Sequence, residues 1–385
     1  MPSLTKSPRI LIVTGEASGD LHGANLAAAL KALAPDVSVL WVGGPRMRAA
    51  GVELVYGIDR LDVIGLIGPT ALRALAHRVL TLRRLLQHEP FDVVVLIDHP
   101  GLNVRFARIA KQAGRRVVYY ITPQVWAWRA GRMRAMRRWV DHALVILPFE
   151  EELYRQAGVP CTFVGHPLLD EMAPSSGRDQ ARSAYGLPRD AQVVGLLPGS
   201  RRGEIQALLS VMLEAVRLLQ QNGRALRVIL AVAETVSQDD IKRMCDASGL
   251  DVRLVVGDPN GVMAASDLLF VASGTATLQA TIIGTPMVIV YKVPWLVYLI
   301  ARVLVRVRSI GLANLIAGRP FIPELIQHEA TPVRLAAEAR RILDDPAYRE
   351  AMRAEMARVR SLLGTPGASR RAAAAVLEQV RREGI

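Results

Sequence analysis

The sequence predicts an α/β protein built from two doubly wound domains, each a parallel sheet with helices on both faces. Short runs rich in valine and isoleucine alternate with segments of helical length, and the same alternation occurs in both halves of the 385 residues. A stretch rich in proline, glycine and serine separates the halves. Runs that are apolar throughout, without polar alternation, are typical of parallel strands buried on both faces.

Each half supplies five strand-like runs. In the first half, strands are expected at Ile10–Val13, Val37–Val42, Asp92–Ile97, Val117–Ile121 and Ala143–Leu147, and helices at Leu21–Leu33, Leu72–His88 and Val104–Ala113. In the second half, strands are expected at Val193–Leu197, Leu226–Val232, Val252–Val256, Leu268–Ala272 and Met287–Tyr291. From Thr331 onward the pattern is helical, with a break at Gly364–Gly367.

These elements divide the chain into four segments. We expect a first domain at 1–171, a linker or hinge at 172–190, a second domain at 191–345, and C-terminal helices at 346–385. One expected arrangement packs these C-terminal helices back on the first domain. The linker assignment rests on Pro174, Ser175, Ser176, Gly177, Gly186 and Pro188. Two doubly wound domains joined by a hinge would hold a ligand in a cleft at the carboxyl ends of their strands.

The composition limits the classes of function. With 51% hydrophobic and 22% charged residues, the chain is neither disordered nor fibrous. Its 48 basic and 35 acidic residues give a net charge of +13, which indicates nucleic acid, an anionic membrane surface or acidic substrates, or only an arginine-rich genome. Two cysteines exclude a disulfide scaffold. No apolar run approaches the ~20 residues of a spanning helix, and the N-terminus lacks a signal-peptide core, so we expect a cytoplasmic protein.

Two turns in the second half have the composition of phosphate-binding loops. One contains Gly199, Ser200 and Arg201 after a predicted strand, and the other contains Ser273, Gly274 and Thr275. Glycine lets the backbone approach an anion, the following helix offers free N–H groups, and arginine supplies a fork for phosphate oxygens. Either turn alone could be an ordinary structural turn, but together they predict a diphosphate site. The turn Thr14–Asp20 fits neither the Walker nor the dinucleotide pattern.

Asp98 is the candidate general base. It follows an apolar strand at the carboxyl end, where partial desolvation would raise its pKa. The alternative is that Asp98 caps the helix that begins near Asn103. His22 and His166 are further candidates, although a lone histidine is more often structural. No pattern suggests a metal site, so we expect neither a metal nor another cofactor.

Two segments combine apolar and basic residues in the manner of a membrane-binding surface. Leu66 and Ile67 belong to an apolar run, and Leu72 and Leu75 begin a helical stripe flanked by arginines; Trp295 opens a second segment with further aromatics and arginines. Burial in the core is the alternative for both segments. Arginines between Trp126 and Trp139 could suggest RNA, but no RNA-binding module pattern is present, so no nucleic-acid partner is expected.

Several blocks, taken together, resemble the lipid-A-disaccharide synthase family. They are GEASGDLHGANL, TPQVWAWR, LPFE, FVGHPLLD, LLPGSR, SGTATLQ and ANLIAGRPFIPELIQ, which occur in this order over most of the chain. The resemblance implies a GT-B fold with two Rossmann-like domains facing a cleft, the first for the acceptor and the membrane and the second for the UDP-sugar. It also implies an inverting, metal-independent enzyme on the cytoplasmic face of the inner membrane. A homodimer is one oligomeric state that the resemblance allows.

The implied reaction joins UDP-2,3-diacylglucosamine to 2,3-diacylglucosamine 1-phosphate, which gives the β-1,6-linked lipid A disaccharide and UDP. By the resemblance, Asp98 is the base. Glu16 is the second catalytic candidate, and Glu16 and Asp20, both in the first block, are the candidates for positioning the acceptor. Gly199, Ser200, Arg201, Ser273, Gly274, Thr275, Gln279, Asn314 and Glu324 match donor-site blocks, with Gln279 where the family commonly has glutamate. After Asp98 the chain has His99-Pro100-Gly101-Leu102-Asn103, where the family usually has Ala/Ser-Pro-Asp-Phe-Asn.

Other readings remain open at this point. A second UDP-sugar enzyme of the same fold, such as a lipid-acceptor N-acetylglucosaminyltransferase or a 2-epimerase, would share the phosphate turns. A membrane-associated UDP-sugar binder without activity would also share them, but it would not need Asp98. The residues do not indicate the length of the acyl chains or the acceptor preference.

Overall fold

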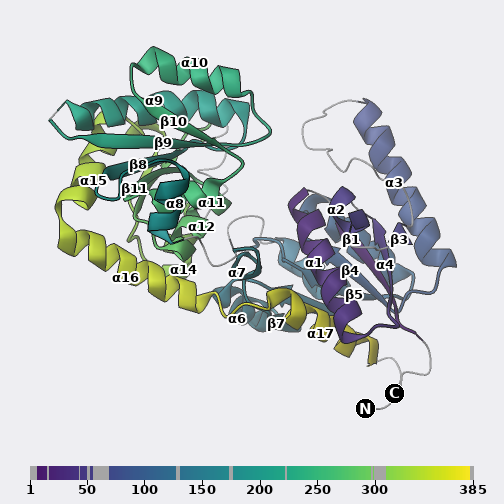
Figure 1. Ribbon diagram of the computed structural model, residues 1–385. Coiled ribbons are helices and arrows are strands. Elements are labelled where there is room, and N and C mark those ends of the chain that lie inside the picture. Colours follow the sequence, from purple (N-terminus) through teal and green to yellow (C-terminus); the bar gives the residue numbers. More distant parts are fainter. Residues whose placement is uncertain are drawn as a thin grey trace. The chain divides into compact units, whose positions relative to one another are not determined.

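The chain forms two compact units, and it passes twice from one to the other. The computed structural model describes residues 7–14, 17–42, 44–49, 53–54, 69–126, 131–172, 177–221, 223–295, 298 and 309–381. Unit 1 comprises Met1–Glu171 together with Leu363–Ile385, and unit 2 comprises Met172–Leu362 (Figure 1). Each unit has its own parallel sheet, which confirms the predicted fold class of two doubly wound α/β units.

Unit 1 contains a seven-stranded sheet in the order β3-β2-β1-β4-β5-β6-β7. The strands are β1 (Arg9–Thr14), β2 (Ser38–Val42), β3 (Glu53–Leu54), β4 (Val93–Ile97), β5 (Arg116–Tyr120), β6 (His142–Val145) and β7 (Cys161–Phe163). The helices are α1 (Ala17–Leu33), α2 (Pro45–Ala49), α3 (Pro69–His88), α4 (Pro100–Gln112), α5 (Gly131–Trp139), α6 (Pro148–Gln156), α7 (Leu168–Glu171) and α17 (Ala368–Arg381).

Both faces of this sheet are buried, as the apolar strands predict. Along β1, Ile10 and Ile12 pack in one core layer with α1 and α17, whereas Leu11 and Val13 pack in the other layer with α3 and α4. The helix α17, drawn in yellow, therefore completes the core of unit 1 although it follows all of unit 2 in the sequence (Figure 1).

Unit 2 contains a six-stranded sheet in the order β10-β9-β8-β11-β12-β13. The strands are β8 (Gln192–Leu197), β9 (Leu226–Val232), β10 (Val252–Val256), β11 (Leu268–Ala272), β12 (Met287–Tyr291) and β13 (Glu324–Ile326). The helices are α8 (Arg178–Ala184), α9 (Arg202–Gln220), α10 (Gln238–Ser248), α11 (Pro259–Ala265), α12 (Thr275–Ile283), α14 (Leu312–Ala317), α15 (Pro332–Asp344) and α16 (Pro346–Leu362), with a 3-10 turn at Gln327–Glu329.

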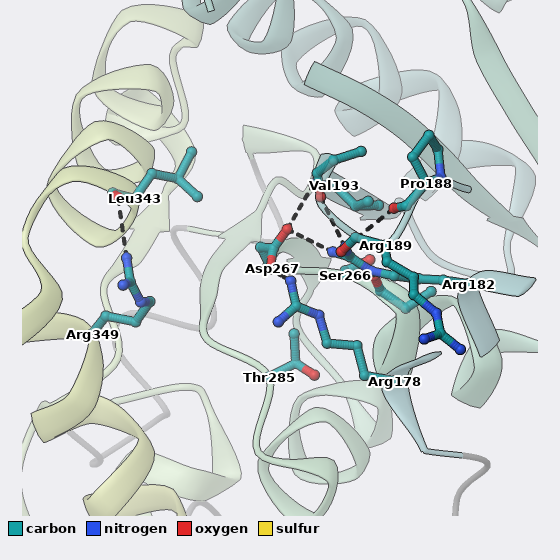
Figure 2. Close-up of polar contacts among 12 residues, drawn as sticks. Arg178, Arg182, Pro188, Arg189, Val193, Ser266, Asp267, Thr285, Leu343 and Arg349 are labelled. Atoms are coloured by element: carbon teal, nitrogen blue, oxygen red, sulfur yellow. Dashed lines mark hydrogen bonds and ion pairs between the residues drawn. The ribbon is translucent and has the colours of Figure 1, made fainter. Parts of the chain in front are cut away.

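A buried arginine fixes α8, within the predicted linker, to the sheet of unit 2. Arg182 is fully buried, and its guanidinium donates to Asp267 Oδ2 over 2.8 Å and to the carbonyl oxygens of Ala265, Arg189 and Ala191 (Figure 2). Asp267 also accepts from the Val193 backbone N–H and pairs with Arg178. These contacts lie where β8 and β11 begin, at the opposite edge from the carboxyl ends.

The strand order defines a switch point in each sheet. In unit 1 the order reverses between β1 and β4, and in unit 2 it reverses between β8 and β11. Open α/β sheets bind ligands just outside the carboxyl ends of the two strands at such a point. Asp98 follows β4 in unit 1, and both predicted phosphate turns follow β8 and β11 in unit 2, so the fold places all three at switch points.

Candidate functional site

The pocket at the switch point of unit 2 collects most of the predicted donor-site residues. It has a volume of about 380 Å³. Its lining includes seven of the nine residues predicted for the UDP-sugar: Gly199, Ser200, Arg201, Ser273, Gly274, Thr275 and Gln279. Ala233, Gly257 and Pro259, which the sequence analysis did not single out, complete it from the ends of β9 and β10.

Two helices begin at this pocket without side-chain caps. Arg201 is the N-cap of α9 and Gly274 is the N-cap of α12; an arginine side chain has no acceptor and glycine has no side chain, so neither residue caps its helix through a side chain. The first N–H groups of a helix have no partner within the helix, and the helix dipole places partial positive charge there. Two such ends at one pocket are an arrangement suited to anionic oxygens, such as those of a diphosphate.

Glycine is required at position 199 for steric reasons. Its φ of 108° lies in a region that residues with a side chain rarely adopt. A Cβ atom there would also lie 2.5 Å from Glu204 Oε2. Glu204 in turn holds the Arg201 guanidinium, with 3.0 Å between Nη1 and Oε1, while 81% of the Arg201 side chain remains exposed. The arginine is thus available at the mouth of the pocket.

Asn314 and Glu324 lie elsewhere in unit 2. The Asn314 amide donates to Ile322 O and Glu324 Oε1 and accepts from the backbone N–H groups of Phe321 and Ile322. Glu324 also accepts from the N–H groups of Ile310 and Gly311. Neither residue lines the pocket described above, and their side chains fix the backbone on both sides of α14.

Asp98, in unit 1, has a strained backbone and a partly buried carboxylate. Its φ is 51° and that of His99 is 43°, both in the left-handed region. Burial raises the pKa of the Asp98 carboxyl, while the His99 backbone N–H and the nearby His22 oppose that rise. Strained residues held by their surroundings cluster at active sites, and a raised pKa suits a general base.

Hydrogen bonds from two side chains hold the backbone of Asp98. Asn103 Nδ2 donates to Asp98 O over 2.8 Å and to Ile97 O over 2.9 Å, and Tyr119 Oη donates to Asp98 O over 2.7 Å. The N-cap of α4 is His99 and α4 starts at Pro100, so Asp98 is not the helix cap of the alternative interpretation.

The other predicted residues of unit 1 have different surroundings. Asp20 is buried and its carboxylate accepts from the N–H groups of Gly44, Arg46 and Met47, which fixes the start of α2. His22 Nδ1 lies 3.1 Å from Glu171 Oε1. His166 is buried, and burial lowers its pKa to about 4, so it is neutral at pH 7. Glu16 lies outside the described residues.

The predicted membrane-binding residues are described only in part. Leu66 and Ile67 lie outside the described residues, and Leu72 and Leu75 lie in α3, whose side chains are described from Val79 onward. Further along the stripe Leu82 and Leu86 are buried in the core. Trp295 is 66% exposed, with its ring centroid 5.9 Å from that of Tyr298. No helix in the described ranges is long and apolar enough to cross a membrane.

Glu150 is a buried acid that the sequence analysis did not single out. It is 1% exposed, and burial raises its pKa to about 7. Its Oε1 accepts from Trp126 Nε1 over 3.1 Å, and its Oε2 accepts from the Leu147 N–H over 3.1 Å. The LPFE block thus anchors the tryptophan of the TPQVWAWR block. The available signal was a Leu-Pro-Phe-Glu block shortly after a strand, with Glu150 as the first of three consecutive glutamates in α6.

Comparison with solved structures supports the fold and defines the class. The UDP-GlcNAc 2-epimerase from Neisseria meningitidis, bound to UDP-GlcNAc, superposes with a TM-score of 0.66 at 13% identity, covering 96% of this chain and all of that one. The calicheamicin glycosyltransferase CalG4 superposes with a TM-score of 0.60 at 16% identity, covering 98% of this chain and 99% of that one. Two doubly wound units with a pocket suited to a diphosphate at one switch point define a protein of the GT-B class.

Comparison of sequences defines the family within that class. A family model described as lipid-A-disaccharide synthetase matches residues 10–378. The lipid-A-disaccharide synthase of Geobacter sulfurreducens is 45% identical over 98% of both chains. That of Myxococcus xanthus is 42% identical over 97% of this chain and 98% of its own. The chain belongs to the lipid-A-disaccharide synthase family of glycosyltransferases.

Proposed function

We propose that the chain transfers a diacylglucosamine unit from UDP to 2,3-diacylglucosamine 1-phosphate, which yields UDP and the β-1,6-linked lipid A disaccharide. The observation that carries this proposal is the pair of uncapped helix ends, α9 and α12, at one pocket. They stabilise the diphosphate as negative charge develops on the leaving group. Family membership supports the choice of donor and acceptor.

The proposed chemistry divides between the two units. In unit 2 the helix ends and Arg201 bind the diphosphate of the donor, and Gln279 accepts a hydrogen bond from the ribose. In unit 1 the Asp98 carboxylate takes the proton from the 6′-hydroxyl of the acceptor as that oxygen attacks the anomeric carbon. Attack on the face opposite UDP inverts the configuration. Glu16 and Asp20 belong to the acceptor side, and Asn314 and Glu324 support the donor side by fixing the backbone around α14.

We also propose that the protein acts as a peripheral enzyme on the cytoplasmic face of the inner membrane. Both substrates are acylated and anionic, so they reside at that surface. The exposed Trp295 and the net charge of +13 suit an anionic interface. Leu66, Ile67, Leu72 and Leu75 form the proposed insertion segment, and a homodimer is the proposed assembly.

The test measures disaccharide formation and UDP release with both acylated substrates in detergent. We expect wild type to form the disaccharide and Asp98→Asn to lose roughly 10²- to 10⁴-fold in kcat. The dissociation constant of UDP serves as the control and should not change in this variant, because the proposed contacts of UDP all come from residues of unit 2. Disaccharide formation by Asp98→Asn at the wild-type rate would move the base to another residue, with Glu16 next. UDP binding by wild type without product would contradict the proposed reaction.

A further inference from the structure

A second cavity of unit 2 adjoins the diphosphate pocket. It has a volume of about 770 Å³ and lies between α9 and α10. Ser200 and Arg201 line both cavities. The turn after β9 is joined to this shared turn, since Thr235 Oγ1 donates to Ser200 O over 3.2 Å. We call this second cavity the α9–α10 groove.

The floor of the α9–α10 groove is apolar. Ile205 from α9 and Ile241 from α10 are buried, and Val236, Met244 and Ala247 are partly or fully accessible within the groove. Nothing in the diphosphate chemistry of the neighbouring pocket requires such a surface. A cavity of this size that combines an apolar floor with polar and charged residues in its lining suits an amphipathic organic ligand.

The charged groups of the groove stand at its rim and largely pair with one another. Asp240 contacts Arg243 and lies 4.0 Å from Arg202, while Arg201 is held by Glu204. These pairs leave the apolar floor without an uncompensated charge directed into it. A ligand that is anionic at one end, beside Ser200 and Arg201, and hydrocarbon beyond that end matches this distribution.

We propose that the α9–α10 groove binds the acyl chain on C2 of the donor sugar. This inference rests on the proposed function. In UDP-2,3-diacylglucosamine the diphosphate is attached to C1, so the chain on C2 leaves the carbon next to the attachment point. A diphosphate at the shared turn therefore places the start of this chain beside Ser200, where the groove opens. The acceptor has no comparable link to the nucleotide site.

The groove would make affinity for the donor depend on chain length. Each methylene that is fully buried strengthens binding about fourfold. The test measures the dissociation constants of UDP and of a series of UDP-2,3-diacylglucosamines whose acyl chains become successively longer. Each donor is used at a concentration at which it remains monomeric. We expect UDP to be insensitive to changes in the groove, and the affinity of wild type for the donors to rise with chain length.

Two variants block the groove and one serves as a matched control. Ala247→Trp fills it from the surface of α10, and Met244→Glu places a charge in its apolar part. Lys242→Trp adds the same bulk to an exposed position of α10 that does not line the groove. Both blocking variants should bind UDP as wild type does and lose about tenfold or more in affinity for long-chain donors, with a flattened length dependence. Lys242→Trp should retain the wild-type length dependence.

The outcomes separate this inference from the proposed function. Wild-type length dependence in both blocking variants, with UDP binding intact, overturns the groove as the acyl site even if wild type forms the disaccharide. A flattened dependence supports the groove even if wild type forms no disaccharide, in which case the proposed reaction fails alone. Equal affinity of wild type for UDP and for every acylated donor overturns the groove.

Discussion

At the scale of single residues, Asp98, the proposed base, combines a left-handed backbone with a partly buried carboxyl. Its left-handed backbone costs of order 1–3 kcal/mol in a residue other than glycine. Hydrogen bonds from Asn103 and Tyr119 to its carbonyl oxygen stabilise that conformation. Burial of the carboxyl raises its pKa.

The pH dependence of catalysis follows from that shift. A base must be deprotonated to act, so kcat/KM should rise with pH and level off above the pKa of Asp98. Because burial raises this pKa, the acid limb should lie above the ordinary value of 3.8. The position of this acid limb is measured from kcat/KM for the donor between pH 4 and 8, with the acceptor at saturating concentration. A limb at or below the ordinary value would contradict the assignment of Asp98 as the base.

The raised pKa of Glu150 should make the protein less stable as pH rises, which is the opposite of the effect of most carboxylates. Its folded pKa of about 7 exceeds its ordinary value of 4.5, so the folded state holds the proton more tightly. Protonated Glu150 contributes roughly 3 kcal/mol to the free energy of unfolding. This contribution is fully present below pH 4.5 and is lost as pH rises through 7. Glu150→Gln should lack this loss, although it gives up one of the two accepted hydrogen bonds.

The difference between wild type and Glu150→Gln isolates this effect. His166, with its folded pKa of about 4, contributes stability above pH 6.5 that is lost as pH falls to 4, and it does so in both proteins. Free energies of unfolding in urea at pH 5 and pH 8 provide the measurement. A difference between the two proteins that does not change with pH would show that Glu150 titrates normally.

At the scale of elements, Arg182 stabilises the contact of α8 with the sheet of unit 2. Arg182→Leu should reduce the free energy of unfolding by about 3–5 kcal/mol, because it leaves buried carbonyl groups unpaired and weakens the support of Asp267. Arg178→Ala is the matched control. It removes the exposed partner of the same carboxylate and should cost about 1 kcal/mol or less (Figure 2). Both free energies of unfolding are measured in urea. Equal losses in Arg182→Leu and Arg178→Ala would mean that the burial of Arg182 adds nothing to stability.

Strands of four or more residues could be predicted from the sequence, and edge strands of two or three residues could not. The strands β9, β10, β11 and β12 have the predicted boundaries, since apolar side chains fill both of their faces or cover one. The strands β3, β7 and β13 have two or three residues each and were missed. So short a strand has no periodicity and depends on a neighbour already in place.

The candidate site followed the same division. Both glycine-rich turns could be predicted to follow strands, because glycine and hydroxyl residues directly after an apolar run mark a turn, and the structure brings them together at one pocket. The partners of Asp20 and Glu324 could not be predicted, since those carboxylates accept hydrogen bonds from backbone groups between 13 and 27 residues away. A motif supplies the residue type, but the fold decides which groups it meets.

At the scale of the whole molecule, α17 is part of the core of unit 1. Its buried face includes Ala372, Ala373 and Val376, which pack with α1 and the sheet. Deletion of 363–381 should therefore expose this core layer and destabilise unit 1 while unit 2 keeps its stability. Hydrogen exchange of β1 and β4, compared with β8 and β11, measures this. Equal loss of protection in both units would contradict the assignment of α17 to unit 1.

The double passage of the chain between units has a consequence for biosynthesis. A ribosome releases polypeptide from the N-terminus onward, and domains ordinarily fold in that order. Here the sheet of unit 1 emerges first but lacks a helix that is translated only after residue 362. Unit 2, whose residues 172–362 are contiguous, can complete its core earlier. During synthesis the nascent N-terminal half must therefore keep the face that α17 will cover from associating with other chains.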